Sequence, residues 1–238
     1  MARLSIRQPL DEQKNKKYTH SILLILGVST MKEHIAAVHK QTIAQAAERL
    51  FLERGFDGTS ISDICAASGY SRRTVYRYFD TKEEILYYIV ANGLEQLRDR
   101  LTDIVQAEQP FLAKYEHICK AMRAYYEHCP VSARAVHQFQ PKALETVTPT
   151  METIFSLGTA INDALARWIE QGIAEGVVRE TADVMMTVYV FSAQLHALFD
   201  LVETKGAFLL PTLGKTKEQF FAYGQKMIFN SLAKEPLR

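Results

Sequence analysis

The stretch over residues 59–82 constrains the fold of this chain most, because it places helix starts on both sides of an enforced chain reversal. Ser60 and Asp63 have the spacing of a capping box, in which each side chain satisfies a free backbone donor at a helix start. The helix predicted over residues 61–68 ends at Gly69, because glycine takes up a positive φ without strain. A second helix follows this turn, and the pair is predicted to form a helix-turn-helix.

The second helix, predicted over residues 72–79 with Ser71 as its cap, has an apolar side and a basic side. Val75 and Phe79 lie four residues apart and can both pack inward. The outward residues are Arg72, Arg73, Thr74, Tyr76 and Arg77. Arginine can donate two hydrogen bonds to guanine, and threonine can contact a base edge or a thymine methyl group. The coincidence of turn, caps and basic side favours entry into the major groove of DNA over the alternative, a solvated charged face.

Lys82 gives a second indication of a DNA partner. Thr81 and Glu84 have the spacing of another capping box, which makes Lys82 the first residue of the next helix. A cation at this position opposes the helix dipole at a cost of about 0.3–1 kcal/mol. The cost is explained if a phosphate lies over the helix start, bound by free backbone amides and by the ammonium group. We therefore expect Lys82 to contact a DNA phosphate.

These residues resemble the core pattern of the TetR (tetracycline-repressor-like) family of transcriptional regulators. The matching positions are Thr59, Ile64, Ala67, Gly69, Ser71, Thr74, Val75, Tyr76, Tyr78, Phe79, Thr81, Lys82 and Glu83. Tyr70 stands where the family usually has valine, and Arg73 stands where it frequently has glycine. Both departures lie at the start of the second helix, so they bear on which operator sequence is read rather than on whether DNA is bound.

The resemblance implies a domain order and a set of DNA contacts. A flexible N-terminal extension over residues 1–30 is expected to precede a helix-turn-helix DNA-binding domain over residues 31–82. An effector-binding and dimerisation domain over residues 83–238 is expected to follow. By resemblance, Ser60 and Ser62 contact the DNA backbone, Arg72, Arg73 and Thr74 face bases, and Tyr76, Tyr78 and Lys82 bind phosphates. Ser71 and Arg77 complete the expected DNA-binding set.

The net charge and the cysteine content limit which functions and which cellular compartment the chain fits. The net charge of the whole chain is only +1, whereas residues 71–82 contain four basic residues and one acid. This local patch on a nearly neutral chain suits a regulator that releases DNA better than a nonspecific DNA-packing protein. The three cysteines include no C-x-x-C pair, which is typical of a protein of the reducing cytoplasm.

Residues 1–30 differ in composition from the rest, with scattered basic residues before an apolar run over residues 22–28. This run is too short to span a bilayer, which requires about twenty residues. We expect no membrane partner and a loose tail here, and Met31 is an alternative start of the native protein.

The remaining sequence predicts an all-α fold, because apolar residues recur at helical spacing and no convincing alternation of strand period occurs. The helices are predicted over residues 32–54, 82–107, 111–129, 131–140, 149–175, 182–204 and 217–233. The helix over residues 82–107 belongs to both domains, so its tilt can move the helix that reads DNA.

The last two predicted helices carry more apolar residues than one buried face requires. These residues are Met185, Met186, Val188, Tyr189, Phe191, Leu195, Leu198, Phe199, Phe220, Phe221, Met227, Ile228 and Phe229. One face can serve the core of its own chain, and the other favours a homodimer through residues 182–204 and 217–233. A two-fold dimer would place two DNA-reading helices roughly 34 Å apart, or a multiple of that distance. The alternative is that both faces are buried within one chain.

The sequence offers little for catalysis or metal binding. His117, Cys119, His128 and Cys129 cannot form one site from a single helix, because His117 and His128 are about 16 Å apart along it. No glycine-rich phosphate loop, nucleophile elbow or H-E-x-x-H motif occurs. We therefore expect neither an enzyme nor a bound cofactor or metal.

A small-molecule effector is expected within the C-terminal domain, partly by analogy with the family. Bulky side chains with few polar tips suit an apolar or aromatic ligand. The candidates are Tyr125, Tyr126, His137, Phe139, Met151, Phe155, Trp168, Tyr189 and His196. The predicted function is a homodimeric repressor that such an effector releases from a palindromic operator. Alternatives are an activator or DNA-associated interaction protein without a ligand, and a binding or catalytic bundle with a vestigial DNA unit.

Overall fold

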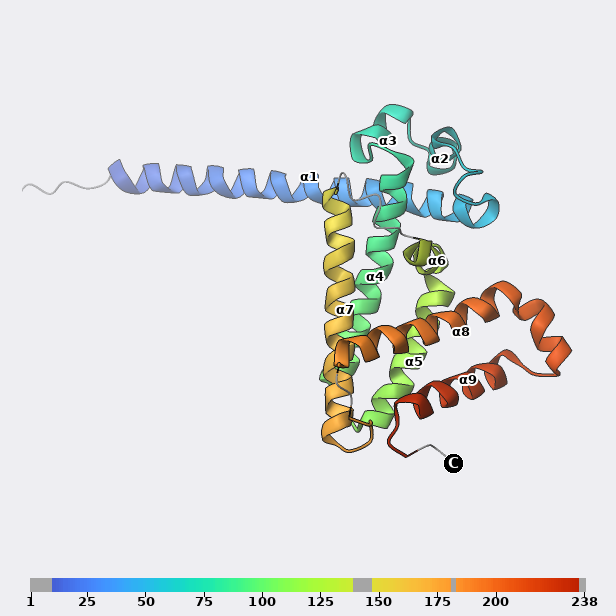
Figure 1. Cartoon of the computed structure of the whole chain (residues 1–238). Coiled ribbons are helices and arrows are strands. Elements are labelled where there is room, and N and C mark those ends of the chain that lie inside the picture. Colours follow the sequence, from blue (N-terminus) through green and yellow to red (C-terminus); the bar gives the residue numbers. More distant parts are fainter. Residues whose placement is uncertain (1–9, 139–146, 181–182, 236–238) are drawn as a thin grey trace, which may run out of the picture.

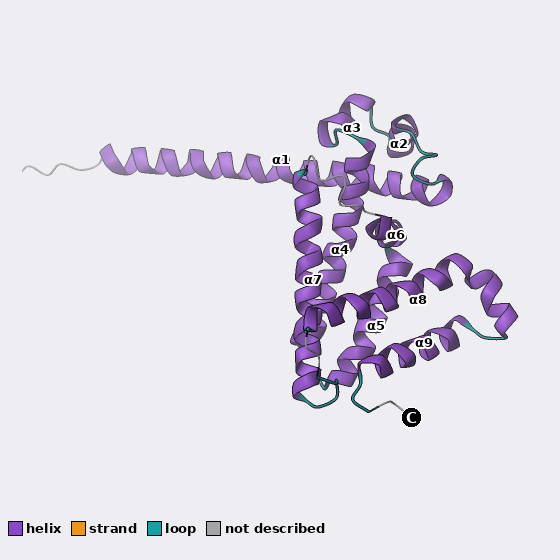
Figure 2. Cartoon of the chain, viewed as in Figure 1, coloured by secondary structure: helices purple, strands orange, loops and turns teal. Residues whose placement is uncertain are grey.

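The computed structural model describes residues 10–138, 147–180 and 183–235, without the side chains of residues 10–30 and 137–138. The described residues form nine helices joined by short connections (Figures 1 and 2). They are α1 (Leu10–Arg54), α2 (Ile61–Ser68), α3 (Arg72–Tyr78), α4 (Lys82–Gln106), α5 (Phe111–His128), α6 (Pro130–Gln138), α7 (Pro149–Ala174), α8 (Val184–Leu213) and α9 (Lys217–Leu232). The all-α prediction is confirmed.

A small hydrophobic core holds α2 and α3 against the C-terminal part of α1 and the start of α4. Ile43 of α1, Ile64 of α2, Val75 of α3 and Ile85 of α4 are all fully buried in this cluster. Burying side chains of this size stabilises a fold by roughly 1.5–3 kcal/mol each. The inward side of the helix-turn-helix is therefore fixed by packing, and its outward side is left to solvent.

Glycines end two of the helices that frame this unit. Gly69, with a φ of 75°, ends α2 and donates its N–H to the carbonyl of Cys65. Gly55, with a φ of 76°, ends α1, and its N–H donates to the carbonyl of Phe51 at 3.0 Å. The ring of Phe56 then packs on Phe51 with ring centroids 5.3 Å apart. The chain reverses at both positions because glycine alone lacks the Cβ that would strain a positive φ.

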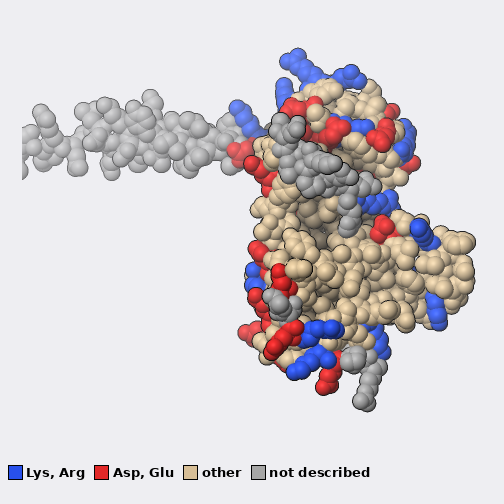
Figure 3. All heavy atoms as spheres, viewed as in Figure 1, with Lys and Arg blue, Asp and Glu red and all other residues tan. Residues whose placement is uncertain are grey.

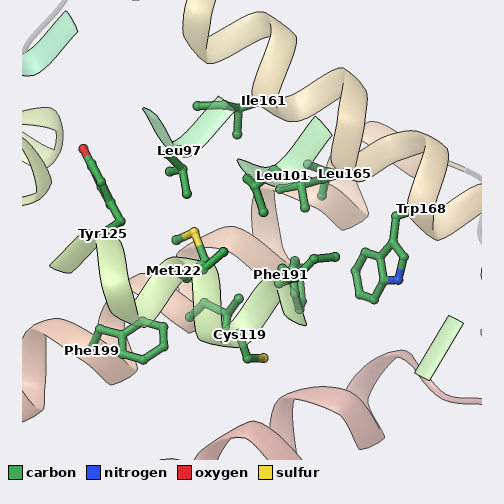
Figure 4. Close-up of a cluster of buried hydrophobic side chains, with 14 of the residues drawn as sticks. Leu97, Leu101, Cys119, Met122, Tyr125, Ile161, Leu165, Trp168, Phe191 and Phe199 are labelled. Atoms are coloured by element: carbon green, nitrogen blue, oxygen red, sulfur yellow. The ribbon is translucent and has the colours of Figure 1, made fainter. Parts of the chain in front are cut away.

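The second core lies between α4, α5, α7, α8 and α9 and is rich in aromatic side chains (Figure 4). In Figure 1, α4 and α7 run side by side, while α8 and α9 form a hairpin that packs across the other end of the bundle. Trp168 is fully buried and stacks on Phe111 with ring centroids 4.4 Å apart. Phe191 and Phe199 close the same core from α8.

The helix α6 approaches α4 closely at Gly93. A Cβ atom at this position would lie 2.4 Å from Oγ of Ser132, which is shorter than any ordinary contact. The Ser132 hydroxyl donates to the carbonyl of Val90 at 3.1 Å and also bonds to the hydroxyl of Tyr125 at 2.8 Å. Glycine at residue 93 thus allows a buried polar contact between the two helices.

Most predicted helix boundaries agree with the structure within one residue. The start of α1 and the end of α8 do not, and the predicted end of α6 at residue 140 lies outside the described residues. The helix α1 begins at Leu10 instead of residue 32. The helix α8 continues to Leu213, past the predicted end at residue 204, and stops at Gly214, whose φ is 61°. The buried Gly206 lies inside α8 and does not end it. The N-terminal cap of α8 is Asp183, and the predicted start at residues 181–182 lies outside the described residues.

Candidate nucleic-acid interface

The helix α3 presents its basic side to solvent from a rigid base. The Ser71 hydroxyl caps it by accepting the N–H of Thr74 at 3.2 Å. Val75 is fully buried and Phe79 is 5 % exposed, so the inward side is packed as predicted. The three expected arginines, Arg72, Arg73 and Arg77, are exposed. Tyr76 is 45 % exposed. Figure 3 shows Lys and Arg side chains projecting from this end of the molecule.

A complete capping box starts α2 and engages Ser60. The Ser60 hydroxyl and backbone N–H donate to Oδ2 of Asp63 at 2.5 and 2.9 Å, and the Asp63 N–H donates to Oγ of Ser60 at 3.2 Å. These bonds, first that from the hydroxyl, lower the pKa of the Asp63 carboxyl below its ordinary value. The Ser60 hydroxyl, expected to contact the DNA backbone, thus has its proton committed to Asp63 in the DNA-free protein.

Arg72 and Ser62, which were both expected to contact DNA, bond to each other. The Arg72 Nη2 atom donates to Oγ of Ser62 at 2.6 Å, and both residues are exposed. This bond connects the outward surfaces of α2 and α3. It therefore helps to set the angle between the helix that would lie on the DNA backbone and the helix that would enter the groove.

The Lys82 ammonium has different partners from the phosphate expected from the sequence. It donates to the carbonyl oxygens of Phe56 and Thr59 at 2.7 and 2.9 Å. It also lies 4.1 Å from the centroid of the Phe56 ring, a cation–π contact. The presence of a lysine at this helix start thus has a structural explanation, because Lys82 holds the loop between α1 and α2 against α4.

Tyr78, another expected phosphate contact, is half-buried and bonds to a histidine of α1. The Tyr78 hydroxyl lies 2.8 Å from Nδ1 of His39. The His39 ring also packs against Tyr70, with ring centroids 4.9 Å apart. Sequence analysis missed His39, although it lies four residues before the core residue Ile43 and therefore on nearly the same side of α1. This cluster gives Tyr70, which replaces the usual valine, a packing role.

The second capping box predicted at α4 is only half formed. The Thr81 hydroxyl accepts the N–H of Glu84 at 3.1 Å, as expected. The Glu84 carboxylate turns away and accepts a hydrogen bond from the Thr150 hydroxyl of α7 at 3.1 Å. The first turn of α4 is therefore linked to the first turn of α7 as well as to the DNA-binding unit.

Three of the expected effector-binding side chains come together in the structure. Tyr125 and Tyr126 are adjacent on α5, and the Tyr126 hydroxyl lies 2.6 Å from Nδ1 of His196 on α8. Burial raises the pKa of both tyrosine hydroxyls above the ordinary value, so they stay neutral hydrogen-bonding groups. Tyr126 and His196 form a polar pair against the aromatic core, whereas the Tyr125 hydroxyl bonds to Ser132.

The other expected effector-binding residues do not converge on this pair. Trp168 is packed in the core against Phe111, and Met151 is buried in the first turn of α7. Phe155 and Tyr189 are exposed, with 39 % and 60 % of their surface accessible. The side chains of His137 and Phe139 lie outside the described part of the chain. A single pocket lined by the whole set is therefore not formed.

The two remaining kinds of site, a metal cluster and a reactive thiol, have no set of side chains that would form them among the described residues. Across the side chains that the structure describes, no three His, Cys, Asp or Glu residues are placed to hold one metal ion. Cys65, Cys119 and Cys129 are free thiols. Burial raises the pKa of the Cys119 thiol to about 12, which keeps it protonated and unreactive.

Comparison with known proteins agrees with this geometry. A family profile described as "Bacterial regulatory proteins, tetR family" matches residues 43–89, which span the helix-turn-helix and the start of α4. The uncharacterised HTH-type transcriptional regulator YhgD of Bacillus subtilis is 24% identical over 156 residues, covering 63% of this chain and 80% of YhgD. The HTH-type transcriptional repressor KstR2 of Rhodococcus jostii is 29% identical over 139 residues, covering 58% of this chain and 67% of KstR2.

The fold is also that of solved regulators. The crystal structure of AibR in complex with isovaleryl coenzyme A and operator DNA superposes with a TM-score of 0.62. The superposition covers 80% of this chain and 98% of AibR, at 18% identity. The profile, the relatives and the fold all point to transcriptional regulators and not to enzymes. In this chain an exposed arginine-bearing helix stands on a helix-turn-helix scaffold that is joined to a helical C-terminal domain, and the chain belongs to the TetR family of DNA-binding transcriptional regulators.

Proposed function

We propose that this protein is a homodimeric repressor that binds a palindromic operator and is released from it by a small effector. The exposed side of α3, with Arg73 and Arg77 in solvent above a packed apolar side, is the observation that carries the proposal. The repressor assignment takes support from KstR2, a relative named as a repressor. In this proposal residues 31–82 bind DNA and residues 83–238 bind the effector and dimerise, in the cytoplasm.

The proposed DNA contacts divide into base-reading and backbone-binding groups. Arg72, Arg73, Thr74 and Arg77 would face base edges from α3, because arginine and threonine have the donors and methyl group that major-groove recognition uses. The backbone-binding groups would be Ser60, Ser62, Ser71, Tyr76 and Tyr78. We assign the Lys82 ammonium to the loop carbonyls of Phe56 and Thr59, and the free amides at the start of α4 to a phosphate.

The apolar surface of α8 and α9 supports the dimer. Met186 and Val190 on α8 are 65% and 58% exposed, and Tyr223 and Met227 on α9 are 68% and 59% exposed. Within α8 an 18-residue window has the length and hydropathy of a membrane span, yet only 22% of it is buried. A long, apolar, mostly uncovered helix needs a partner surface, and a second copy of this chain offers the same helices in two-fold symmetry.

The effector proposal rests on α4, which contributes Ile85 and Ile89 to the DNA-binding core and Leu97 and Leu101 to the C-terminal core. A ligand that favours one tilt of α4 would move both α3 helices relative to the DNA grooves, provided that it binds the two states with different affinity. We propose an apolar or aromatic molecule that contacts the Tyr126 and His196 pair and the neighbouring ring of Tyr125. The solved AibR complex with isovaleryl coenzyme A shows that a protein of this fold can hold ligand and operator.

The test is selection of bound duplexes from a random pool, followed by affinity measurements at several salt concentrations. The proposal expects a palindromic site whose half-sites are about 10 base pairs apart or a multiple of that, with two protomers bound per site. The affinity should fall steeply as salt rises, because phosphate contacts release counterions. Absence of salt-dependent duplex binding would refute the proposal. DNA affinity that no screened compound changes would favour an activator or interaction protein without a ligand.

A further inference from the structure

We propose that the groove between the outer faces of α4 and α5 binds an amphipathic carboxylate, a molecule with an apolar body and a single negatively charged head. This site goes beyond the proposed function: Tyr125 lines the groove, but Tyr126 and His196 do not. The groove has a volume of about 580 Å³. Small-molecule sites in proteins usually occupy about 300–1,000 Å³, so the groove has room for an organic ligand.

The floor of the groove is apolar. It is formed by Leu97 and Ile104 of α4 and by Ala121 and Ala124 of α5. The two alanines have short side chains, which leaves the space between the helices open instead of filled. An apolar chain of a ligand could therefore displace water from this floor and gain the free energy of hydrophobic burial.

The walls of the groove carry an excess of positive charge. Arg100 of α4 and Lys120 of α5 both line it, and neither makes an ion pair with any residue that the structure describes. The helices α4 and α5 are joined by the short turn after Gln106, so Arg100 lines the groove from one helix and Lys120 from the other. Asp103 is the one acidic residue among the lining side chains. Two permanent cations against one carboxylate favour an anionic ligand over a cationic or neutral one.

Histidines at the two ends of the groove add polar boundaries. His117 bonds through Nδ1 to Oε1 of Gln109 at 3.1 Å, and His128 bonds through Nδ1 to the carbonyl of Ala124 at 2.9 Å. The histidines lie eleven residues apart on one helix, about 16 Å along its axis. A ligand with an extended apolar chain fits this length better than a compact aromatic ring.

The position of the groove on α4 gives its occupation a mechanical consequence. A carboxylate bound by Arg100 and Lys120 at once would connect α4 to α5 on the side away from α7. The N-terminal turn of α4 holds the DNA-binding unit through Lys82. Any effect of this ligand on DNA affinity rests on the proposed function, whereas its binding does not.

The test is calorimetric titration of the full chain with decanoate below its micellar concentration, compared with decanol as the uncharged analogue. Decanoate should bind the parent protein, and decanol should bind at least tenfold more weakly. Arg100→Gln and Lys120→Gln should each raise the dissociation constant for decanoate about tenfold, because each removes one charge-assisted contact. Arg167→Gln, at an exposed position of α7, is the matched control and should change nothing.

A filling variant separates the site from general attraction of anions. Ala124→Phe should abolish decanoate binding while leaving the helical circular dichroism unchanged, because the new ring would occupy the open floor. The proposal is overturned if decanoate does not bind, or if it binds the Arg100→Gln, Lys120→Gln and Ala124→Phe variants as it binds the parent. Duplex binding by the parent is measured in the same preparation, so failure of the repressor proposal would be seen independently of this result.

Discussion

At the scale of single residues, a contact with a distant part of the chain can explain a side chain that breaks a local rule. Lys82 breaks the rule that cations avoid helix starts, and the sequence alone suggests that a phosphate compensates. The structure supplies a different compensation in the carbonyls of Phe56 and Thr59, which lie 26 and 23 residues away in the chain. Such partners cannot be found from spacing along one helix.

The first prediction concerns this contact. Lys82→Met should lower the free energy of unfolding by about 1–3 kcal/mol, because it leaves two loop carbonyls without their donor. It should weaken binding to all duplexes without changing the slope of affinity against salt. Urea unfolding and salt-dependent anisotropy measure the two effects, with the exposed Arg167→Met of α7 as control. A slope reduced by roughly 0.9, with unfolding unchanged, would show that the ammonium contacts a phosphate after all.

The second prediction concerns the α2 capping box and pH. The Ser60 hydroxyl and amide hold the pKa of the Asp63 carboxyl below its ordinary value of 3.8. Since the folded pKa is lowered, this stabilisation is complete above the ordinary value and is lost as the pH falls through the folded one. NMR titration should therefore give Asp63 a pKa below 3.8 in the parent, and a higher one in Ser60→Ala. Equal values in the two proteins would contradict the role of the box.

At the scale of elements, α4 is held at both ends by lysine ammonium groups that donate to backbone carbonyls. Lys82 holds the loop before α2 at one end, and the buried Lys114 donates to the carbonyl of Val105 and to Oε1 of Gln171, both at 2.7 Å, at the other. These anchors, together with the close approach of α6 at Gly93, make α4 the element whose position the rest of the molecule determines.

The third prediction tests that close approach. Gly93→Ala should destabilise the protein by about 1–3 kcal/mol, because the new methyl group would overlap Oγ of Ser132 in a buried contact. Gly158→Ala is the matched control, since a Cβ at that helical position meets nothing within 4 Å. The control should be neutral or slightly stabilising, because alanine favours a helix by about 0.5–1 kcal/mol over glycine. Urea unfolding curves that shift equally for both variants would rule out the packing argument.

Helix positions could be predicted from the sequence wherever a cap or a proline marks an end. The starts of α2, α3 and α4 follow Ser60, Ser71 and Thr81, and each of these side chains makes the predicted cap. The end of α8 was placed too early, at residue 204, where neither a cap nor a proline marks an end. The helix continues to Leu213, where Gly214 with a φ of 61° ends it.

At the scale of the whole molecule, the side facing DNA was easier to predict than the side facing an effector. Arg73 and Arg77 are exposed because Val75 and Phe79 are buried, and helical spacing alone gives that relation. The effector candidates were chosen by residue type, so they divide between core, surface and the Tyr126–His196 pair. Helical periodicity predicts which residues face inward, but the shape of the space between helices depends on packing.

The fourth prediction tests the dimer. Val190→Glu should convert the protein to a monomer in light scattering, because it places a charge in the middle of the apolar surface of α8. Operator affinity should fall with it, since two half-sites are no longer bound together. Leu112→Glu, at an exposed apolar position of α5, is the control and should leave the protein dimeric. A Val190→Glu protein that stays dimeric would place the interface elsewhere.

The most direct measurement of the central claim is the base preference of Arg73→Ala. Arg73 is exposed at the start of α3, with no bonding partner among the described residues. Duplexes selected from a random pool should show that the variant has lost discrimination at one position in each half-site, at a cost of about 1–3 kcal/mol on the parent operator. Unchanged affinity and an unchanged preference at every position would contradict the claim that α3 reads the bases.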